Sequence, residues 1–365
     1  MPKRQCRGEC DGGRAAKRRR RQRQLYLVFD DWSRGYSIRK VTLPPSGSVP
    51  GDEQQLPRAL LRFAAERGCP QFLTSAFGGR IVVAHPDASS TTVPVIDVRA
   101  RAFMPGPRTN HPAHPIYIPV GADKLFALDI GTFELCCSPA PPEPDNGEWP
   151  WREVQKQPFN IADVSSNAVG YEERAIFVST KSSRGDGTAA TFTFDIVESV
   201  WKKHGEWALP FTGRGYFDRD LDAFVGLSKD PENLGYLCCC HVAAGAATGN
   251  NSPSPDPDCR RSKEKVYNNH PDEHERHVSA TLVYGRRSKF CLVECVSIDE
   301  DVARADHQVP AGTASRYMYR LITFTLRYDR MGDVRVKHYR VRCCYKVPRG
   351  TTTEFVIQDP VAFWL

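Results

Sequence analysis

The chain has 365 residues, of which 40% are hydrophobic and 25% are charged, with a formal net charge of +7. These values are ordinary for a globular protein, and the length allows one large domain or two smaller ones. No apolar run approaches the roughly 18 residues of a membrane helix. The start Met1-Pro2-Lys3-Arg4 lacks an apolar signal core, so we expect neither a membrane protein nor a secreted one.

Residues 1–24 form a basic segment with few apolar residues. They hold ten Lys/Arg and two acidic residues, a net charge of +8, so within the total of +7 the remaining residues sum to −1. We predict a disordered tail that is either a nuclear-import signal or merely a solvating segment. No aromatic residue lies among the charges to stack on bases, so nucleic-acid binding by the tail alone would be weak and salt-sensitive. The residues of the possible import signal are Lys3, Arg4, Lys17, Arg18, Arg19, Arg20, Arg21 and Arg23.

Short strands separated by turns fill most of the chain from residue 25 onward. Residues 25–29 are an apolar run and residues 36–43 alternate, and the polar segment between them favours a hairpin. Residues 56–67 fit either a short helix or a strand, and we favour a strand because the surroundings are β. Further strands are predicted at 81–83, 93–98, 115–120, 125–129, 175–179, 235–242, 281–285, 290–298, 317–328 and 334–345.

Residues 243–278 differ from the rest in composition. They are rich in Ala and Gly, then in Asn, Ser, Pro and Asp, and then in mixed charge, which is typical of a disordered insertion. Without this insertion and the tail, about 305 residues of short strands remain, enough for six propeller blades of about 40–50 residues, with seven as the alternative. We therefore predict an all-β fold, a β-propeller that spans residues 25–365, because a β-sandwich of this length would be oversized.

An apolar strand that ends in an aspartate recurs along the chain. Asp195 is followed six residues later by Trp201, and Asp97 is followed six residues later by Phe103, while Asp129 ends another such strand. Aspartate side chains at these positions commonly bond the backbone of the following turn. We predict that the aspartates cap turns and that the aromatic residues fill the space between blades, with exposed partner anchors as the alternative.

The stretch 194–227 carries most of these features and resembles a plant kelch-like family of unknown function that is expanded in grasses. The segments 36–43, 79–86, 95–98 and 115–118 resemble other parts of the same family, so that the resemblance covers about residues 25–345. It implies a kelch-like propeller and no reaction, although only Gly78-Gly79 matches the glycine pair of kelch repeats. The structural residues of the motif would be Asp97, Asp129, Asp195, Trp201, Trp207, Pro210, Phe211, Leu221, Asp222 and Gly226.

The thirteen cysteines include no Cys-x-x-Cys pair. Neighbouring cysteines in a strand point to opposite faces, so we expect buried, reduced thiols rather than a disulfide framework. Two short Cys pairs and one run of histidines lack the second ligand pair that a zinc site needs, and we predict no metal site. These groups are Cys6 with Cys10, Cys291 with Cys295, and His270 with His274 and His277.

The sequence offers little catalytic chemistry. It has no nucleophile elbow, no phosphate-binding loop and no dinucleotide fingerprint. Asp218, Asp220 and Asp222 are spaced by two and could do acid–base work, but turn chemistry is the more common use of such residues. We predict no catalytic residue and no cofactor.

The sequence therefore predicts a non-enzymatic propeller that binds a protein or peptide of unknown identity on a loop-rich face, in the nucleus or the cytoplasm. One alternative is a propeller enzyme, which would need carboxylates, His or Tyr converging at the central channel. The other is a nucleic-acid-associated protein that is tethered by its basic tail.

Overall fold

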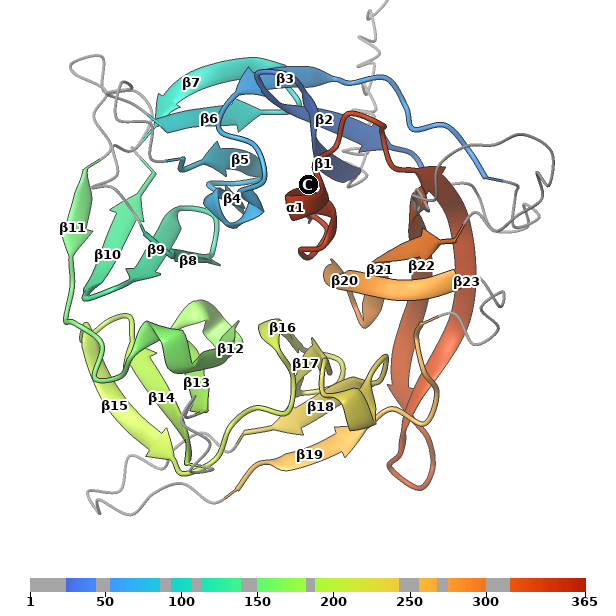
Figure 1. The fold of residues 1–365 in the computed structure, drawn as a ribbon. Helices are drawn as coiled ribbons and strands as arrows, with labels where there is room; N and C mark the ends of the chain where they lie inside the picture. The colour runs from blue at the N-terminus through green and yellow to red at the C-terminus, as the bar shows by residue number, and fades with distance from the viewer. Residues whose placement is uncertain are drawn as a thin grey trace, which may run out of the picture.

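Short antiparallel strands surround an open centre in the computed structural model of this protein (Figure 1). The structure describes residues 24–43, 53–85, 93–106, 113–138, 150–181, 188–242, 256–267, 275–299 and 316–365. The predicted import signal lies outside these residues. None of the helices within the described ranges is long and apolar enough to cross a membrane.

The strands pair in groups of four that follow one another around the ring. Four sheets have four strands each, and a fifth has eight, which divide into two antiparallel groups where β12 and β16 run parallel. In Figure 1 each group runs outward from the centre. The innermost strands are β4, β8, β12, β16 and β20, and β24 holds this place in the group of β1, β2 and β3. The β-propeller class is thereby confirmed, and the count of six blades stays a prediction with which this grouping agrees.

The blades, each written from the innermost strand outward, share this order and differ mainly in strand length. They are β24 (Ala362–Trp364), β1 (Leu25–Trp32), β2 (Gly35–Val41) and β3 (Leu61–Ala64); β4 (Leu73–Ala76), β5 (Arg80–Val83), β6 (Val93–Asp97) and β7 (Ala102–Gly106); β8 (Ile116–Val120), β9 (Lys124–Asp129), β10 (Thr132–Cys137) and β11 (Trp151–Glu153); β12 (Val164–Val169), β13 (Ala175–Lys181), β14 (Ala189–Asp195) and β15 (Val200–Gly205); β16 (Gly213–Asp218), β17 (Ala223–Leu227), β18 (Leu237–His241) and β19 (Asp258–Arg261); and β20 (Glu275–Arg286), β21 (Lys289–Ile298), β22 (Arg316–Tyr328) and β23 (Val334–Lys346).

Helical turns are short and lie between strands. The first turn of α1 (Thr353–Val356) is capped by the Thr352 hydroxyl, which accepts a hydrogen bond from the Phe355 N–H at 3.2 Å. The Phe355 side chain is fully buried, and its ring lies 6.0 Å from that of Tyr36. This helix therefore helps to hold the last strand in place. The 3₁₀ turns are Pro70–Phe72, Ile161–Asp163, Tyr171–Glu173 and Pro231–Asn233.

The last strand of the chain completes the first blade. β24 pairs antiparallel with β1, with Leu25 opposite Trp364 and Leu27 opposite Ala362. Ring closure of this kind joins the two ends of the chain in one sheet, with β24 as the innermost strand of that blade. A strand of three residues was too short to predict from the sequence.

Aromatic side chains fill the space between neighbouring blades. Phe133 of β10 lies 4.8 Å from Phe194 of β14 and 5.1 Å from Trp201 of β15, measured between ring centroids. Trp201 is 8% exposed, and its indole N–H donates to the Gln155 carbonyl at 3.0 Å. Burial of such rings is the main stabilising term of the interface between these two blades.

Two strand predictions have clear outcomes. Residues 61–64 are strand β3, so the choice of strand over helix in 56–67 is confirmed. The predicted unstructured insertion at 243–278 is wrong for the residues that the structure describes there, because 258–261 form β19 and β20 begins at Glu275. β19 pairs with β18 and covers an edge that would otherwise be open. Val266 and Tyr267, which follow it, are buried.

The structure also corrects the cysteine prediction at one pair. Cys240 of β18 stands opposite Cys259 of β19, and the two form a disulfide. Alternation along a strand prevents neighbouring cysteines from bonding each other. It does not prevent one of them from bonding a cysteine directly opposite on the next strand, as Cys240 does with Cys259. Other described cysteines are free, and burial raises the pKa of Cys136 to about 12 and that of Cys238 to about 11.

Candidate functional site

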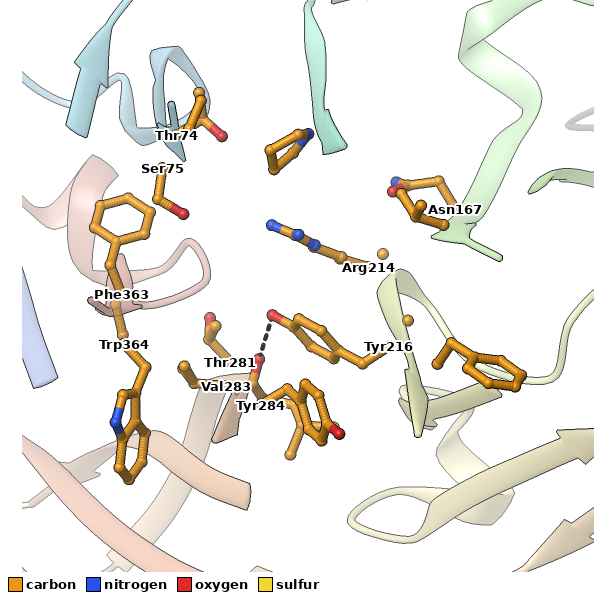
Figure 2. A pocket seen from close by; sticks show the side chains of 18 of the residues that line it. Thr74, Ser75, Asn167, Arg214, Tyr216, Thr281, Val283, Tyr284, Phe363 and Trp364 are labelled. Atoms are coloured by element: carbon orange, nitrogen blue, oxygen red, sulfur yellow. Dashed lines mark hydrogen bonds between the residues drawn. The ribbon is translucent and has the colours of Figure 1, made fainter. Parts of the chain in front are cut away.

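The inner strands surround a central channel of about 1220 Å³. Its wall comes from β4, β8, β12, β16, β20 and β24, with turns at both ends (Figure 2). Neighbouring inner strands such as β12 and β16 run parallel. The turns between first and second strands and between third and fourth strands therefore lie at one face of the ring, except that β24 and β1 are the two ends of the chain and no turn joins them. We call this face the hairpin face.

Arg214 is a charged side chain that extends into the channel. Figure 2 shows it reaching from β16 toward the open middle, with Thr74 and Ser75 across from it. Its guanidinium carbon lies 5.1 Å from the centroid of the Tyr216 ring, a cation–π distance. Within the part of the chain that the structure describes, no carboxylate forms an ion pair with Arg214.

Arg214 faces the channel because of the alternation along β16. Successive residues of a strand point to opposite faces, so Arg214 and Tyr216 share the channel side while Gly215 faces the other way. A Cβ atom on Gly215 would lie 2.4 Å from the Phe211 ring. The glycine thus leaves room for a packed aromatic ring behind the strand that presents Arg214.

Two buried polar side chains line the channel without a partner. Asn167 of β12 is 7% exposed and Thr74 of β4 is 6% exposed; neither side chain bonds a described residue, and neither is among the fully buried unpartnered groups, so both open to the channel. Asn167 stands directly opposite Arg214 in the parallel pairing of β12 with β16. The two residues are therefore backbone neighbours on the channel wall, and the Arg214 side chain extends from there toward the open middle (Figure 2).

Several other polar groups on this wall bond neighbouring elements, although the buried Tyr117 hydroxyl has no partner among the described residues. The Tyr216 hydroxyl donates to the Leu282 carbonyl at 3.0 Å, and the Thr281 hydroxyl donates to the Pro360 carbonyl at 2.7 Å. Lys229 forms an ion pair with Asp359. These bonds tie neighbouring inner elements together and leave Arg214 and Asn167 available to a ligand.

Aromatic rings give the channel an apolar component. The Tyr216 and Tyr284 ring centroids are 5.8 Å apart, and Phe363 and Trp364 line the wall from β24.

Two tyrosines of the channel have raised pKa values. Burial raises the pKa of Tyr117 far above its usual value. For Tyr284 burial is the larger cause of the raised pKa, and the nearby Asp218 carboxylate is the second. These phenols stay neutral at physiological pH.

Charged turns surround the channel on the hairpin face. The β12–β13 turn holds Glu172 and Glu173, with φ values of 63° and 58°, and the β20–β21 turn holds Arg286 and Arg287. Tyr171, 53% exposed, lies beneath the Arg219 guanidinium at 5.1 Å. The charged residues of the channel wall and its mouths are Arg99, Glu172, Glu173, Arg214, Arg219, Asp220, Lys229, Arg286, Arg287 and Asp359.

The aspartates predicted as turn caps do bond turn backbone. Asp97 accepts from the Arg99 and Ala100 N–H groups at 2.9 and 2.8 Å. Asp195 accepts from the N–H groups of Val197 and Glu198 at 2.9 and 3.0 Å. The hydrogen bond from the Glu198 N–H is the largest cause of the lowered pKa of Asp195. Both turns join the third and fourth strands of their blades.

The predicted repeating unit needs two corrections. Asp129 ends the second strand of its blade; it accepts from the Ile130 N–H of the following turn at 2.7 Å and also from Ala113 and His114 at 2.7 and 3.0 Å, so its turn joins the second and third strands. Phe103 is 49% exposed, so the prediction that it fills the space between blades is wrong. β7 is the outermost strand of its blade, and the side chain faces solvent there.

The aspartates spaced by two lie in one turn and are held there structurally. Asp218 is fully buried and accepts from the Asp220 and Leu221 N–H groups, each at 3.0 Å. It also accepts from the Ser288 N–H at 2.7 Å and from its hydroxyl at 2.8 Å, in the next blade. Asp222 has a φ of 50° in the same turn. Asp218 therefore links two blades.

The remaining motif residues lie behind the inner strands. Trp207 and Phe211 are 7% and 2% exposed in a cluster with Phe224, and Leu221 is 5% exposed in the adjoining cluster. A Cβ atom on Gly226 would lie 2.1 Å from the Phe211 ring. Pro210 lines a separate pocket of about 320 Å³. The structure brings none of these motif residues to the channel wall.

The described residues contain no group of three His, Cys, Asp or Glu side chains placed to hold a metal ion. His277, one of the three histidines considered above, bonds Glu294 at 3.1 Å, and its ring stacks on Tyr267 at 4.1 Å. His270 and His274 lie outside the described residues, as do Cys6 and Cys10.

A family model described as "Protein of unknown function (DUF1668)" matches residues 22–345. The chain belongs to this family. No curated protein matches the chain.

Solved structures similar to this chain resemble it only remotely in sequence. One is a protein from Bacteroides uniformis described as a candidate 6-phosphogluconolactonase (10% identity; 89% of this chain and 100% of that chain covered; TM-score 0.39). Others are Hsv2 from Kluyveromyces lactis (8%; 88% and 99%; 0.37) and a protein from Lactobacillus plantarum (9%; 89% and 99%; 0.37). The fold assignment rests on the strand pairing described above and not on these likenesses.

The sequence did not single out Arg214, Asn167 or Thr74. A signal was present for one of them, because Arg214 stands between two glycines in an apolar strand, where a charge is out of place unless it faces water. Nothing local distinguishes Asn167 or Thr74, since their common role depends on the parallel pairing and the closure of the ring.

Proposed function

We propose that this protein is a non-enzymatic propeller that binds a segment of a partner protein in its central channel and at the mouth on the hairpin face. The observation that carries the proposal is the channel itself, whose volume of about 1220 Å³ exceeds the roughly 300–1,000 Å³ typical of small-molecule pockets. It combines aromatic rings with polar and charged side chains, and aromatic residues and arginine are enriched at protein interfaces.

The mouth adds a feature typical of protein interfaces. Tyr171 is exposed at the channel rim with Arg219 stacked over it, and tyrosine and arginine are enriched among residues that dominate binding energy. A segment that enters the channel would pass this pair.

Filling the channel tests the proposal. Ser75 lines the wall, and Ser75→Trp should block entry, whereas Thr132→Trp adds the same side chain at an exposed site away from the channel. Cross-linking in native extract should recover a specific partner with the wild-type chain and with Thr132→Trp, but not with Ser75→Trp. Recovery of the same partner with all three chains would contradict the proposal.

We propose, further, that the propeller is of the kelch-like kind and of plant origin. The support is the resemblance given above and the Gly78-Gly79 pair, whose φ values of 76° and 97° suit glycine. Amplification of the coding sequence from grass genomic DNA would test the origin.

The basic tail is proposed as a nuclear address. Gln24, its last residue, exchanges backbone hydrogen bonds with Leu365 at 2.7 and 2.9 Å beside the channel. Deletion of residues 1–23 should move a fluorescent fusion out of the nucleus. If the deletion instead abolishes binding to nucleic acid, the tail is a tether.

A propeller enzyme is the second candidate, supported by the adjacent carboxylates of Glu172 and Glu173 on a turn with two left-handed residues. Such backbone strain occurs often at functional sites. Any turnover found with a panel of ester, lactone and glycoside substrates should then disappear in the Glu172→Gln/Glu173→Gln double variant.

A further inference from the structure

The channel wall holds a cation and an amide whose hydrogen-bonding capacity the described residues do not use. Arg214 is exposed to the channel, and Asn167 is its direct neighbour across the parallel β12–β16 pair. Neighbouring strands are about 4.8 Å apart, so one ligand group can reach both side chains. The Asn167 side chain is 7% exposed, has no partner among the described residues and is open to the channel, so its amide can bond a ligand there.

We propose that Arg214 and Asn167 form a carboxylate-binding subsite in the channel, and that the partner segment carries an acidic group which enters it. This inference rests on the proposed function. It adds the chemistry of the ligand, since a carboxylate has the acceptor atoms that a guanidinium fork and an amide NH₂ can bond together.

The surroundings favour an anion of single charge. The Tyr216 ring at 5.1 Å holds the guanidinium from one side and leaves its N–H edge directed toward the open middle (Figure 2). Recognition of phosphorylated segments commonly uses clusters of arginines. Arg214 is the arginine that the inner strand β16 presents, whereas Arg99, Arg219, Arg286 and Arg287 line the channel from turns and a strand end, and Lys229 is paired with Asp359. A single guanidinium on the inner strand beside a neutral amide suits a carboxylate.

The size of the channel favours a carboxylate on a peptide over a free small anion. At about 1220 Å³ the channel extends well beyond the subsite. The Thr74 hydroxyl across the channel, together with Phe363 and Trp364, offers polar and apolar contacts to neighbouring parts of an extended segment.

An array of immobilised eight-residue peptides tests the inference with the full-length chain. One set has an amidated C-terminus and carries Glu, Gln, Lys or phosphoserine at one central position in otherwise matched sequences. A second set carries Gln there and a free C-terminal carboxylate. Comparison of the two sets distinguishes an acidic side chain from a chain terminus as the source of the carboxylate.

The matched control for Arg214→Gln is Arg340→Gln, which removes the same charge from an exposed position on β23, the outermost strand of its blade. We expect wild type and Arg340→Gln to bind carboxylate peptides at least about tenfold more tightly than their Gln counterparts, as charge-assisted hydrogen bonds predict. Arg214→Gln should remove this preference, Arg214→Lys should restore part of it, and Asn167→Ala should lower it about fivefold.

Two results would overturn the carboxylate subsite and leave the proposed function standing. One is binding of wild type to the peptides with equal affinity whether or not they carry a carboxylate. The other is an unchanged preference for carboxylate peptides in Arg214→Gln. Tighter binding of the phosphoserine peptides than of the Glu peptides would overturn the carboxylate assignment. Absence of binding by wild type to every peptide would instead overturn the proposed function on which the inference rests.

Discussion

Phe211 and Arg214 are three residues apart in one segment and have opposite surroundings. The Phe211 ring is 2% exposed, and it lies so close to Gly215 and Gly226 that a Cβ atom on either would come within 2.4 and 2.1 Å of it. Arg214 instead faces the channel. The two faces of an inner strand thus serve different purposes, so substitutions on the blade side should change stability and substitutions on the channel side should change binding.

The largest effect is expected at Phe211. Phe211→Ala removes a fully packed ring, and we expect a loss of about 3–5 kcal/mol in the free energy of unfolding, measured by chemical denaturation and by the Tm. Phe103→Ala is the matched control because Phe103 is 49% exposed, and it should cost far less. An equal loss of unfolding free energy in the two variants would contradict the contrast between a packed blade side and an open channel side.

The glycine behind the ring should give the next largest effect. Gly226→Ala places a Cβ atom 2.1 Å from the Phe211 ring, and overpacking of this kind costs about 1–3 kcal/mol. In the Phe211→Ala background the added methyl group has room, so its cost should disappear or change sign. Additive losses in this double-mutant cycle would show that the contact with Phe211 is not the cause.

The contrast between blade-side packing and the channel wall also explains which parts of the structure could be predicted from the sequence. Trp201, Trp207 and Phe211 stand out because large aromatic residues recur beside turns, and that local pattern was enough to predict a propeller. β19 and the Cys240–Cys259 disulfide could not be predicted, because each depends on a cross-strand partner distant in sequence.

The channel site was still harder to predict. Arg214 and Asn167 become neighbours only through a parallel pairing between two blades, and neither belongs to a motif. Sequence patterns report burial along one strand, whereas a channel wall takes one or two residues from each of several strands.

A small pH-dependent effect is expected at Asp195, on the outer side of its blade. Backbone N–H bonds from Glu198 and Val197 lower its pKa below the usual 3.8, so the ionised form is favoured in the folded chain. Its contribution to stability is complete above pH 3.8 and is lost as the pH falls through the lower pKa of the folded state.

The Tm of Asp195→Asn should therefore lie below that of wild type at pH 6, and the two should converge as the pH is lowered below 3.8. Asp123→Asn, at an exposed turn position, serves as the charge control. A difference between wild type and Asp195→Asn that grows toward acid pH would contradict the assignment.

The smallest effect on stability is expected at Arg214. Its side chain is exposed, and its one described contact is the Tyr216 ring at 5.1 Å, so Arg214→Gln should change the free energy of unfolding by no more than about 0.5 kcal/mol. The same variant should lose the preference for carboxylate peptides that wild type shows. A large loss of stability in Arg214→Gln would mean that the channel side of β16 supports the fold as the blade side does, and the division between packing at Phe211 and binding at Arg214 would fail.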